Sequence, residues 1–89
     1  MKIVSDIDLK ILLKYGFKRI PYINYYQKTV YYDSQKMYSY IQYTINTKTR
    51  LIEIKTVNLG HYESIFAIDD TLYNLMKDNL IEKIESKGE

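Results

Sequence analysis

The chain lacks or nearly lacks the residues on which most small-protein chemistry depends. Its 89 residues include no cysteine, no tryptophan, one histidine and three glycines. Without cysteine, disulfide scaffolds, thiol nucleophiles and thiolate zinc sites are excluded. The serines lie in no nucleophile-elbow context, and His61 falls in a predicted loop. We therefore expect no catalytic residue, no cofactor and no metal site, and a protein that is not an enzyme.

Long hydrophobic runs are also missing. No apolar stretch approaches the ~20 residues that a membrane-spanning helix needs. The N-terminus has no hydrophobic core of a signal peptide, because polar residues interrupt it from Ser5 onward. These absences predict a cytoplasmic protein with no membrane partner. At 89 residues, the chain has room for a single domain spanning residues 1–89.

Charge of either sign is modest over the whole chain but unevenly distributed. The formal net charge is +2, from 13 basic and 11 acidic side chains. Residues 1–45 carry seven basic and three acidic groups, whereas residues 46–89 carry six and eight. The near-neutral total argues against a general polyanion binder. Any positive surface must come from the N-terminal half, as a lysine-rich solvated face.

Two segments are predicted to be helical. Over residues 6–15, Ser5 or Asp6 is placed to cap the N-terminus, and Gly16 supplies a left-handed stop. A second helix begins near residue 71, where Asp69 or Asp70 is placed to cap it. Its apolar stripe has the spacing of three and four residues that is typical of a helix, and consists of Leu72, Leu75, Met76, Leu80 and Ile84. Asn79 is a competing stop that would leave residues 80–84 extended against the sheet edge.

Three segments are predicted to be strands. Residues 24–32 are rich in β-favouring residues, and residues 38–46 and 50–57 alternate between apolar and polar side chains. Residues 46–49 form a plausible hairpin turn between the last two. Residues 64–68 fit either a short fourth strand or the start of the final helix, because periodicity does not separate these alternatives.

These elements predict an α+β fold. We expect a small two-layer domain in which an N-terminal and a C-terminal helix cover one face of a three- or four-stranded antiparallel sheet. The other face would then be open to water or to a partner, as antiparallel sheets permit.

Tyrosine is the residue that the chain has in excess. There are eleven, and nine of them lie between Tyr15 and Tyr43, on the predicted strands and beside basic residues. Alternation over residues 38–46 places Tyr38 and Tyr40 opposite Ile41, Tyr43 and Ile45. An outward tyrosine row suits protein recognition, because tyrosine offers large and stiff contact area. The predicted partner-binding residues are Tyr26, Tyr32, Tyr38, Tyr40, Lys28 and Lys36.

Two other partners fit the same residues. Aromatic side chains among lysines are typical of single-stranded nucleic-acid binding, in which bases stack on the rings. The net charge is small, however, and no ribonucleoprotein motif is present. The tyrosine row could also join two copies of the chain in a homodimer.

The layout resembles a group of phage proteins. The stretches that carry the resemblance are residues 12–18 (LLKYGFK), 46–52 (NTKTRLI) and 71–76 (TLYNLM) leading into 80–83 (LIEK). They are similar to small uncharacterised phage and prophage proteins of low-GC Gram-positive bacteria. The resemblance covers structural motifs and implies no catalytic residue. It implies an accessory or anti-defence role, such as an anti-CRISPR-like inhibitor, acting on a host or phage protein in the host cytoplasm.

Overall fold

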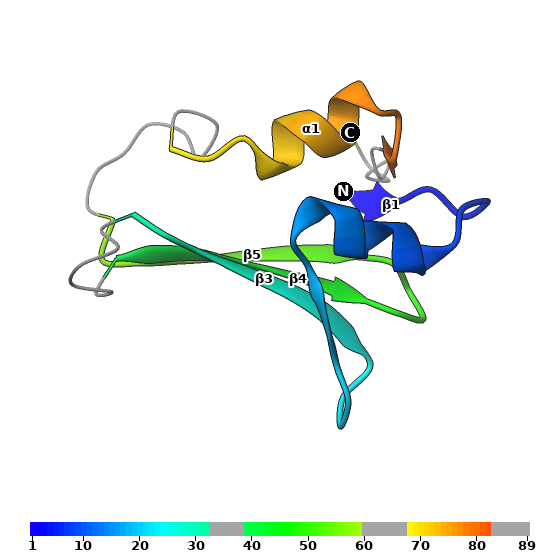
Figure 1. Cartoon of the computed structure of the whole chain (residues 1–89), viewed down its shortest axis with the longest axis horizontal. Helices are drawn as coiled ribbons and strands as arrows, with labels where there is room; N and C mark the ends of the chain where they lie inside the picture. Colours follow the sequence, from blue (N-terminus) through cyan, green and yellow to red (C-terminus); the bar gives the residue numbers. More distant parts are fainter. Residues whose placement is uncertain (33–38, 60–67, 83–89) are drawn as a thin grey trace, which may run out of the picture.

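The fold is a four-stranded antiparallel sheet covered on one face (Figure 1). The computed structural model describes residues 1–32, 39–59 and 68–82. The elements in chain order are β1 (Lys2–Ile3), the 3-10 helix η1 (Leu9–Tyr15), β2 (Lys18–Ile20), β3 (Tyr25–Tyr31), β4 (Tyr40–Asn46), β5 (Ile52–Val57), α1 (Thr71–Lys77) and β6 (Ile81–Glu82). The large sheet has the order β2-β3-β4-β5, and β1 and β6 form a separate two-stranded sheet. Figure 1 shows η1, α1 and the β1–β6 pair on the same side of the large sheet.

The predicted fold class is wrong in its helices and in its number of sheets. The described residues contain one short α-helix, α1, rather than an N-terminal and a C-terminal helix flanking a single sheet. The N-terminal helix is a 3-10 helix, and a second sheet, β1–β6, joins the two ends of the described chain. The domain is therefore mostly sheet, with little helix.

Element η1 is a 3-10 helix. A 3-10 helix repeats every three residues, so residues three apart share one face. Leu9, Leu12 and Tyr15 have this spacing, and Leu12 is fully buried. The expected cap at Ser5 or Asp6 is also corrected, since Asp8 is the N-cap and its carboxylate accepts a hydrogen bond from the Lys10 N–H. Gly16 ends η1 in the left-handed conformation, as predicted.

Strand β2 occupies a segment in which the sequence predicts only a connection. It pairs antiparallel with the start of β3, with Lys18 opposite Gln27 and Ile20 opposite Tyr25. Arg19 stabilises the turn that follows, because its guanidinium donates hydrogen bonds to the carbonyl oxygens of Ile20 and Ile23. The fourth strand of the large sheet is therefore β2, and the expected alternative, residues 64–68, lies almost wholly outside the described residues.

The hairpin of β4 and β5 is confirmed. Tyr43 lies opposite Ile54 and Ile45 lies opposite Ile52, as their alternation predicts. The Asn46 side chain accepts hydrogen bonds from the backbone N–H groups of Lys48 and Thr49, which builds the turn.

Helix α1 begins at Thr71, as predicted, and ends before Asn79. Asn79 has a φ of 59°, its N–H donates to the Met76 carbonyl, and the Leu80 N–H donates to the Leu75 carbonyl. This is the Schellman arrangement that ends helices at a left-handed residue. The chain then enters β6, so the alternative of an extended segment after Asn79 is right. Its position is wrong, because β6 pairs with β1 rather than with the edge of the large sheet.

The core lies between the covered face of the large sheet and the elements above it. Tyr43 is its largest fully buried side chain, and the Phe17 ring packs edge-on against it at 6.4 Å between centroids. The buried apolar residues are Ile3, Leu12, Phe17, Tyr26, Ile41, Tyr43, Ile45, Leu59, Leu72, Leu75 and Leu80.

Candidate functional site

The candidate site is the open face of the large sheet, which no described element covers (Figure 1). Along β4, Ile41, Tyr43 and Ile45 are buried, whereas Tyr40, Gln42, Thr44 and Asn46 are partly exposed. Successive strand residues point to opposite faces. The predicted alternation of β4 is therefore confirmed, and Tyr40 belongs to the open face.

The pairing of strands arranges the open face in rows across the sheet. One end has Tyr31, Tyr40 and Val57 side by side, and the other end has Ile20, Tyr25 and Asn46. The two rows between them are polar, and contain Lys18, Gln27, Thr44 and Glu53, then Thr29, Gln42 and Lys55. The open face thus has an aromatic row at each end and a polar centre.

Tyr31 and Tyr40 form the most exposed aromatic contact of this face. Their ring centroids are 5.8 Å apart, and the rings meet edge to face at 62°. Tyr31 is 43% exposed although it contacts another aromatic ring. A pair fixed in this way keeps its orientation while presenting apolar area to solvent.

Two of the predicted binding residues lie on the wrong face. Tyr26 is buried opposite Ile45, and Lys28 is opposite Tyr43, so both belong to the covered face. Tyr26 also packs beneath the Arg19 guanidinium, which lies 5.8 Å from its ring centroid. Their roles are in the interior and at its margin, so neither belongs to a tyrosine row on the open face.

Of the remaining predicted residues, two are among the described residues and two are not. Tyr40 is on the open face, as predicted. Tyr32 follows β3, is 52% exposed, and donates its backbone N–H to the Ser39 carbonyl. Tyr38 and Lys36 lie outside the described residues.

Sequence reasoning missed Tyr25 and Tyr31. Each stands beside a second tyrosine, so the doublets do not show which ring faces outward. The signal that finds them is their register with β4, which places Tyr31 opposite Tyr40 and Tyr25 opposite Asn46.

A polar network on the covered side ties α1 to the sheet. The Asp69 carboxylate accepts hydrogen bonds from the Tyr43 hydroxyl at 2.7 Å and from the Thr71 N–H at 3.0 Å. Burial by itself would raise the pKa of Asp69, but the hydrogen bonds from Thr71 and Tyr43 and the charge of Lys28 outweigh it and lower that pKa. Burial and the Asp69 contact raise the pKa of Tyr43, which keeps its phenol neutral. The network is structural. Of the two predicted caps, Asp70 occupies the N-cap position without a side-chain hydrogen bond, and Asp69, one residue earlier, accepts the Thr71 N–H.

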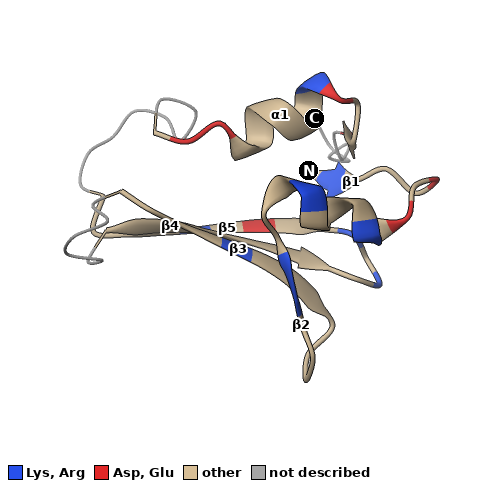
Figure 2. Cartoon of the chain, in the orientation of Figure 1, with Lys and Arg blue, Asp and Glu red and all other residues tan. Residues whose placement is uncertain are grey.

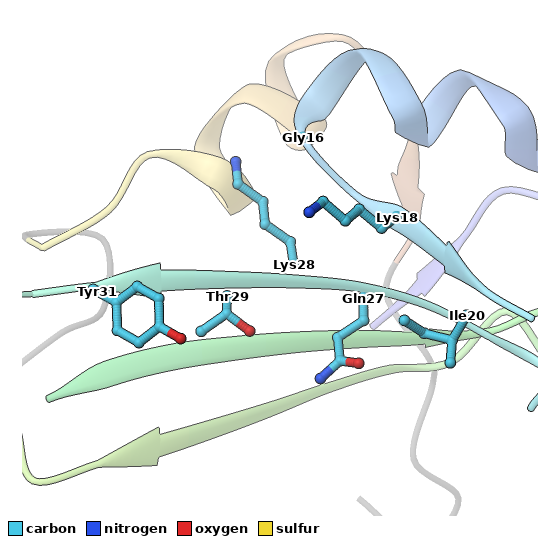
Figure 3. Close-up of a pocket in the computed structure, with 7 residues that line it drawn as sticks. All are labelled: Gly16, Lys18, Ile20, Gln27, Lys28, Thr29 and Tyr31. Atoms are coloured by element: carbon cyan, nitrogen blue, oxygen red, sulfur yellow. The ribbon is translucent and has the colours of Figure 1, made fainter. Parts of the chain in front are cut away.

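A cavity of about 350 Å³ adjoins the open face along β2 and β3 (Figure 3). Its lining residues are Gly16, Lys18, Ile20, Gln27, Lys28, Thr29 and Tyr31. Figure 3 shows the Lys18 and Lys28 side chains extending to one side of β3, beneath the Gly16 end of η1, while Gln27 and Thr29 point away from them. Lys18 and Lys28 are the charged residues of this lining, so the cavity is positively charged.

Charged side chains elsewhere in the described structure are distributed over several elements. Figure 2 shows Lys and Arg on η1, β1, β2 and β3 and at the C-terminal end of α1, whereas Asp and Glu flank α1 and precede η1; β5 carries both Glu53 and Lys55. Within residues 1–32, 39–59 and 68–82, no three acidic or histidine side chains come together as a metal site would require. None of the helices in these same ranges has the length and hydrophobicity needed to cross a bilayer.

Comparison with known protein families, curated proteins and solved structures finds no match to this chain. The functional argument therefore depends on the geometry of the open face and of the cavity beside it.

Proposed function

We propose that this chain is a non-enzymatic protein-binding module, and that its open sheet face makes the contact. The observation that carries the proposal is the pair of aromatic rows, Tyr31–Tyr40–Val57 and Ile20–Tyr25, on a face that no described element covers. Exposed tyrosines support the proposal because tyrosine is enriched among the residues that dominate binding at protein interfaces.

The size of the face is adequate for a protein partner. A tyrosine side chain contributes roughly 150–250 Å² when it is buried. Only the exposed part of each side chain is available to a partner, 43% for Tyr31 and less for Tyr25 and Tyr40, so the three tyrosines would supply a minor share of the ~800 Å² that each partner contributes to a standard interface. The rest would come from the Gln and Thr rows between them.

The charge of the open face favours protein over nucleic acid. Its polar centre carries Lys18 and Lys55 together with Glu53, so Glu53 offsets one of the two positive charges and the rows do not form a strongly positive groove. Single-strand binders instead combine stacking rings with a positive groove that follows the phosphates. Lys28, which the nucleic-acid alternative places beside Tyr40, lies on the covered face. An accessory or inhibitory protein, as the phage resemblance implies, is the most specific form of the proposal.

Site-specific photocrosslinking tests this proposal. A photoreactive phenylalanine analogue replaces Tyr40 on the open face, and the matched control carries it at Tyr22, which is 94% exposed in the turn between β2 and β3. In cells of the source organism, we expect a discrete protein adduct from position 40 that Tyr31→Ala abolishes and that position 22 does not form.

Three results would overturn the proposal. Identical adducts from positions 40 and 22 would show nonspecific contact. An adduct of twice the chain mass would show that a second copy covers the face. Binding of an oligothymidine that weakens steeply with salt would indicate nucleic acid instead.

A further inference from the structure

Strand β3 has a free edge over half its length. It pairs with β4 at all seven of its residues, from Tyr25 to Tyr31, but with β2 only at Tyr25–Gln27. No strand within the described ranges pairs with residues 28–31 on the β2 side. Unpaired edges of this kind accept further strands through backbone hydrogen bonds.

The turn at Gly16 produces this free edge. Gly16 has a φ of 90°, and the Phe17 N–H donates to the Leu12 carbonyl. The chain therefore turns out of η1 at Gly16 and joins the sheet only where β2 begins. A Cβ atom on Gly16 would lie 3.1 Å from Cε of Lys28, which shows how closely the end of η1 approaches the β3 side chain. Beyond this point, no strand of the described residues continues along the edge.

The cavity lies along the free edge. Gln27 and Thr29 belong to the open face of β3 and Lys28 to the covered face, yet all three line the same space. Residues that alternate between faces can line one cavity only where it wraps around the edge of the strand. Tyr31 lies at the far end of the lining and joins it to the aromatic row of the open face.

The charge of the cavity selects the chemistry of an occupant. Lys18 and Lys28 are the charged side chains of its lining, and Lys18 makes no ion pair within the described residues. Lys28 has Asp69 close by, so Lys18 is the cation more available to a ligand. Carboxylates are the complementary groups, and the backbone edge requires an extended chain.

We propose that the free edge of β3 accepts an extended acidic segment of the protein partner as an added strand in line with β2. The proposal rests on the protein-binding function above and specifies the kind of segment that is bound. Backbone hydrogen bonds to β3 residues 28–31 hold the segment, one of its carboxylates pairs with Lys18, and an apolar side chain packs against Tyr31. Strand addition of this type draws affinity from the main chain and specificity from pockets for alternate side chains.

NMR of the full-length, nitrogen-15-labelled chain tests the proposal. The probe is an acetylated and amidated hexapeptide of alternating glutamate and valine. We expect it to shift the amide signals of residues 28–31 and to slow the solvent exchange of Thr29 and Tyr31, whose N–H groups face the free edge because those of Lys28 and Val30 face β4. A glutamine-for-glutamate peptide should bind about fivefold more weakly, since an exposed ion pair contributes up to ~1 kcal/mol. A peptide with N-methylated valines should not bind.

Protein variants supply the matched control. Lys18→Gln should weaken the acidic peptide by about two- to fivefold, and Lys55→Gln, on β5 and outside the cavity, should leave it unchanged. Both lysines are exposed, so neither substitution should disturb folding.

Several outcomes would overturn strand addition. If the lysines only protect the edge from pairing, as charged residues on sheet edges often do, the acidic peptide will shift no amide of residues 28–31. Equal binding by the N-methylated peptide, or the same shifts from inorganic phosphate or glutarate alone, would show a simple anion site. A specific crosslink from position 40 without any peptide effect would support protein binding and rule out strand addition. A peptide effect without a specific crosslink from position 40 would rule out the open-face contact.

Discussion

At the scale of single residues, Asp69 joins two parts of the fold that are distant in sequence. One of its oxygens accepts both the hydroxyl of Tyr43, from the middle of β4, and the N–H of Thr71, from the first turn of α1. Removing Asp69 would take this hydrogen-bond partner from the Tyr43 hydroxyl, and because Tyr43 is fully buried the loss would be costly. The carboxylate is therefore most important for positioning α1 over the sheet.

The lowered pKa of Asp69 predicts a loss of stability in acid. The folded state binds the proton of this carboxyl less readily than the unfolded chain does, for which the ordinary pKa is 3.8. Its contribution is therefore fully present above that value and disappears as the pH falls through the lower folded pKa. Urea unfolding between pH 3 and pH 7 should show wild type losing its advantage over Asp69→Asn towards the acidic end. At pH 7 the variant should be about 1 kcal/mol less stable.

Asp70→Asn is the matched control for this measurement. Asp70 stands at the N-cap of α1, but its side chain makes no capping hydrogen bond. Its substitution should change stability at pH 7 much less than Asp69→Asn. Equal losses from the two variants would show that general charge at the helix start, rather than the Asp69 network, stabilises α1.

At the scale of elements, the two short helices are stabilised by contacts at their ends. Helix α1 has seven residues and η1 has seven, and isolated helices of this length are marginal in water. The Tyr15 hydroxyl of η1 donates to the Asp78 carboxylate at the end of α1, which links the two helices. The Schellman turn at Asn79 then directs the chain into β6 and its pairing with β1.

The left-handed backbone at Asn79 predicts a graded series of variants. Asn79→Ala should destabilise the protein by about 1 kcal/mol, because a Cβ without a compensating side-chain hydrogen bond disfavours this conformation. Asn79→Gly should be neutral or slightly stabilising, since glycine adopts positive φ without strain. Thermal or urea unfolding measures both. A larger loss for glycine than for alanine would contradict the role of this residue as the helix stop.

The sequence patterns were sufficient for the elements whose signals are local. Strand β3 follows from its β-favouring residues, β4 and β5 from alternation, the hairpin turn from its turn residues, and the start of α1 from capping. The type of η1, strand β2 and the β1–β6 pair were not predictable in this way. They depend on tertiary contacts, such as the burial of Leu12 and the pairing of Lys2 with Glu82, across the length of the chain.

The residues of the candidate site were likewise predictable only where the strand pattern is local. The phase of β4 is clear from its isoleucines, and it places Tyr40 correctly on the open face. The phase of β3 is not, because Tyr25–Tyr26 and Tyr31–Tyr32 put an aromatic ring on each face. Only the pairing with β4 shows that Tyr26 is a core residue and that Tyr31 is a surface residue.

At the scale of the whole molecule, the large sheet separates the tyrosines by role. Tyr26 and Tyr43 are in the core with the aliphatic residues of β4, α1 and η1. Tyr25, Tyr31 and Tyr40 are on the opposite face, where no described element packs on them (Figure 1). The tyrosines concentrated between Tyr15 and Tyr43 therefore divide between the core on one face of the sheet and the open face on the other.

This division predicts that stability and binding respond to different tyrosines. Truncating a large buried aromatic residue costs about 3–5 kcal/mol, a large part of the 5–15 kcal/mol that stabilises a typical domain. Tyr43→Ala should therefore lower the free energy of unfolding by about 3–5 kcal/mol. Tyr40→Ala should lower the free energy of unfolding by about 1 kcal/mol, since it loses partial burial and an edge-to-face contact with Tyr31.

The two variants are compared by urea unfolding monitored by circular dichroism, and Tyr40→Ala is then tested for the loss of partner binding. Tyr22→Ala, in an exposed turn, should change neither stability nor binding. If Tyr40→Ala destabilises the protein as much as Tyr43→Ala, the face that bears Tyr40 is part of the folding core. If Tyr40→Ala stays folded and loses the partner, the exposed rings of this face are retained for recognition, since the sheet is stable without them.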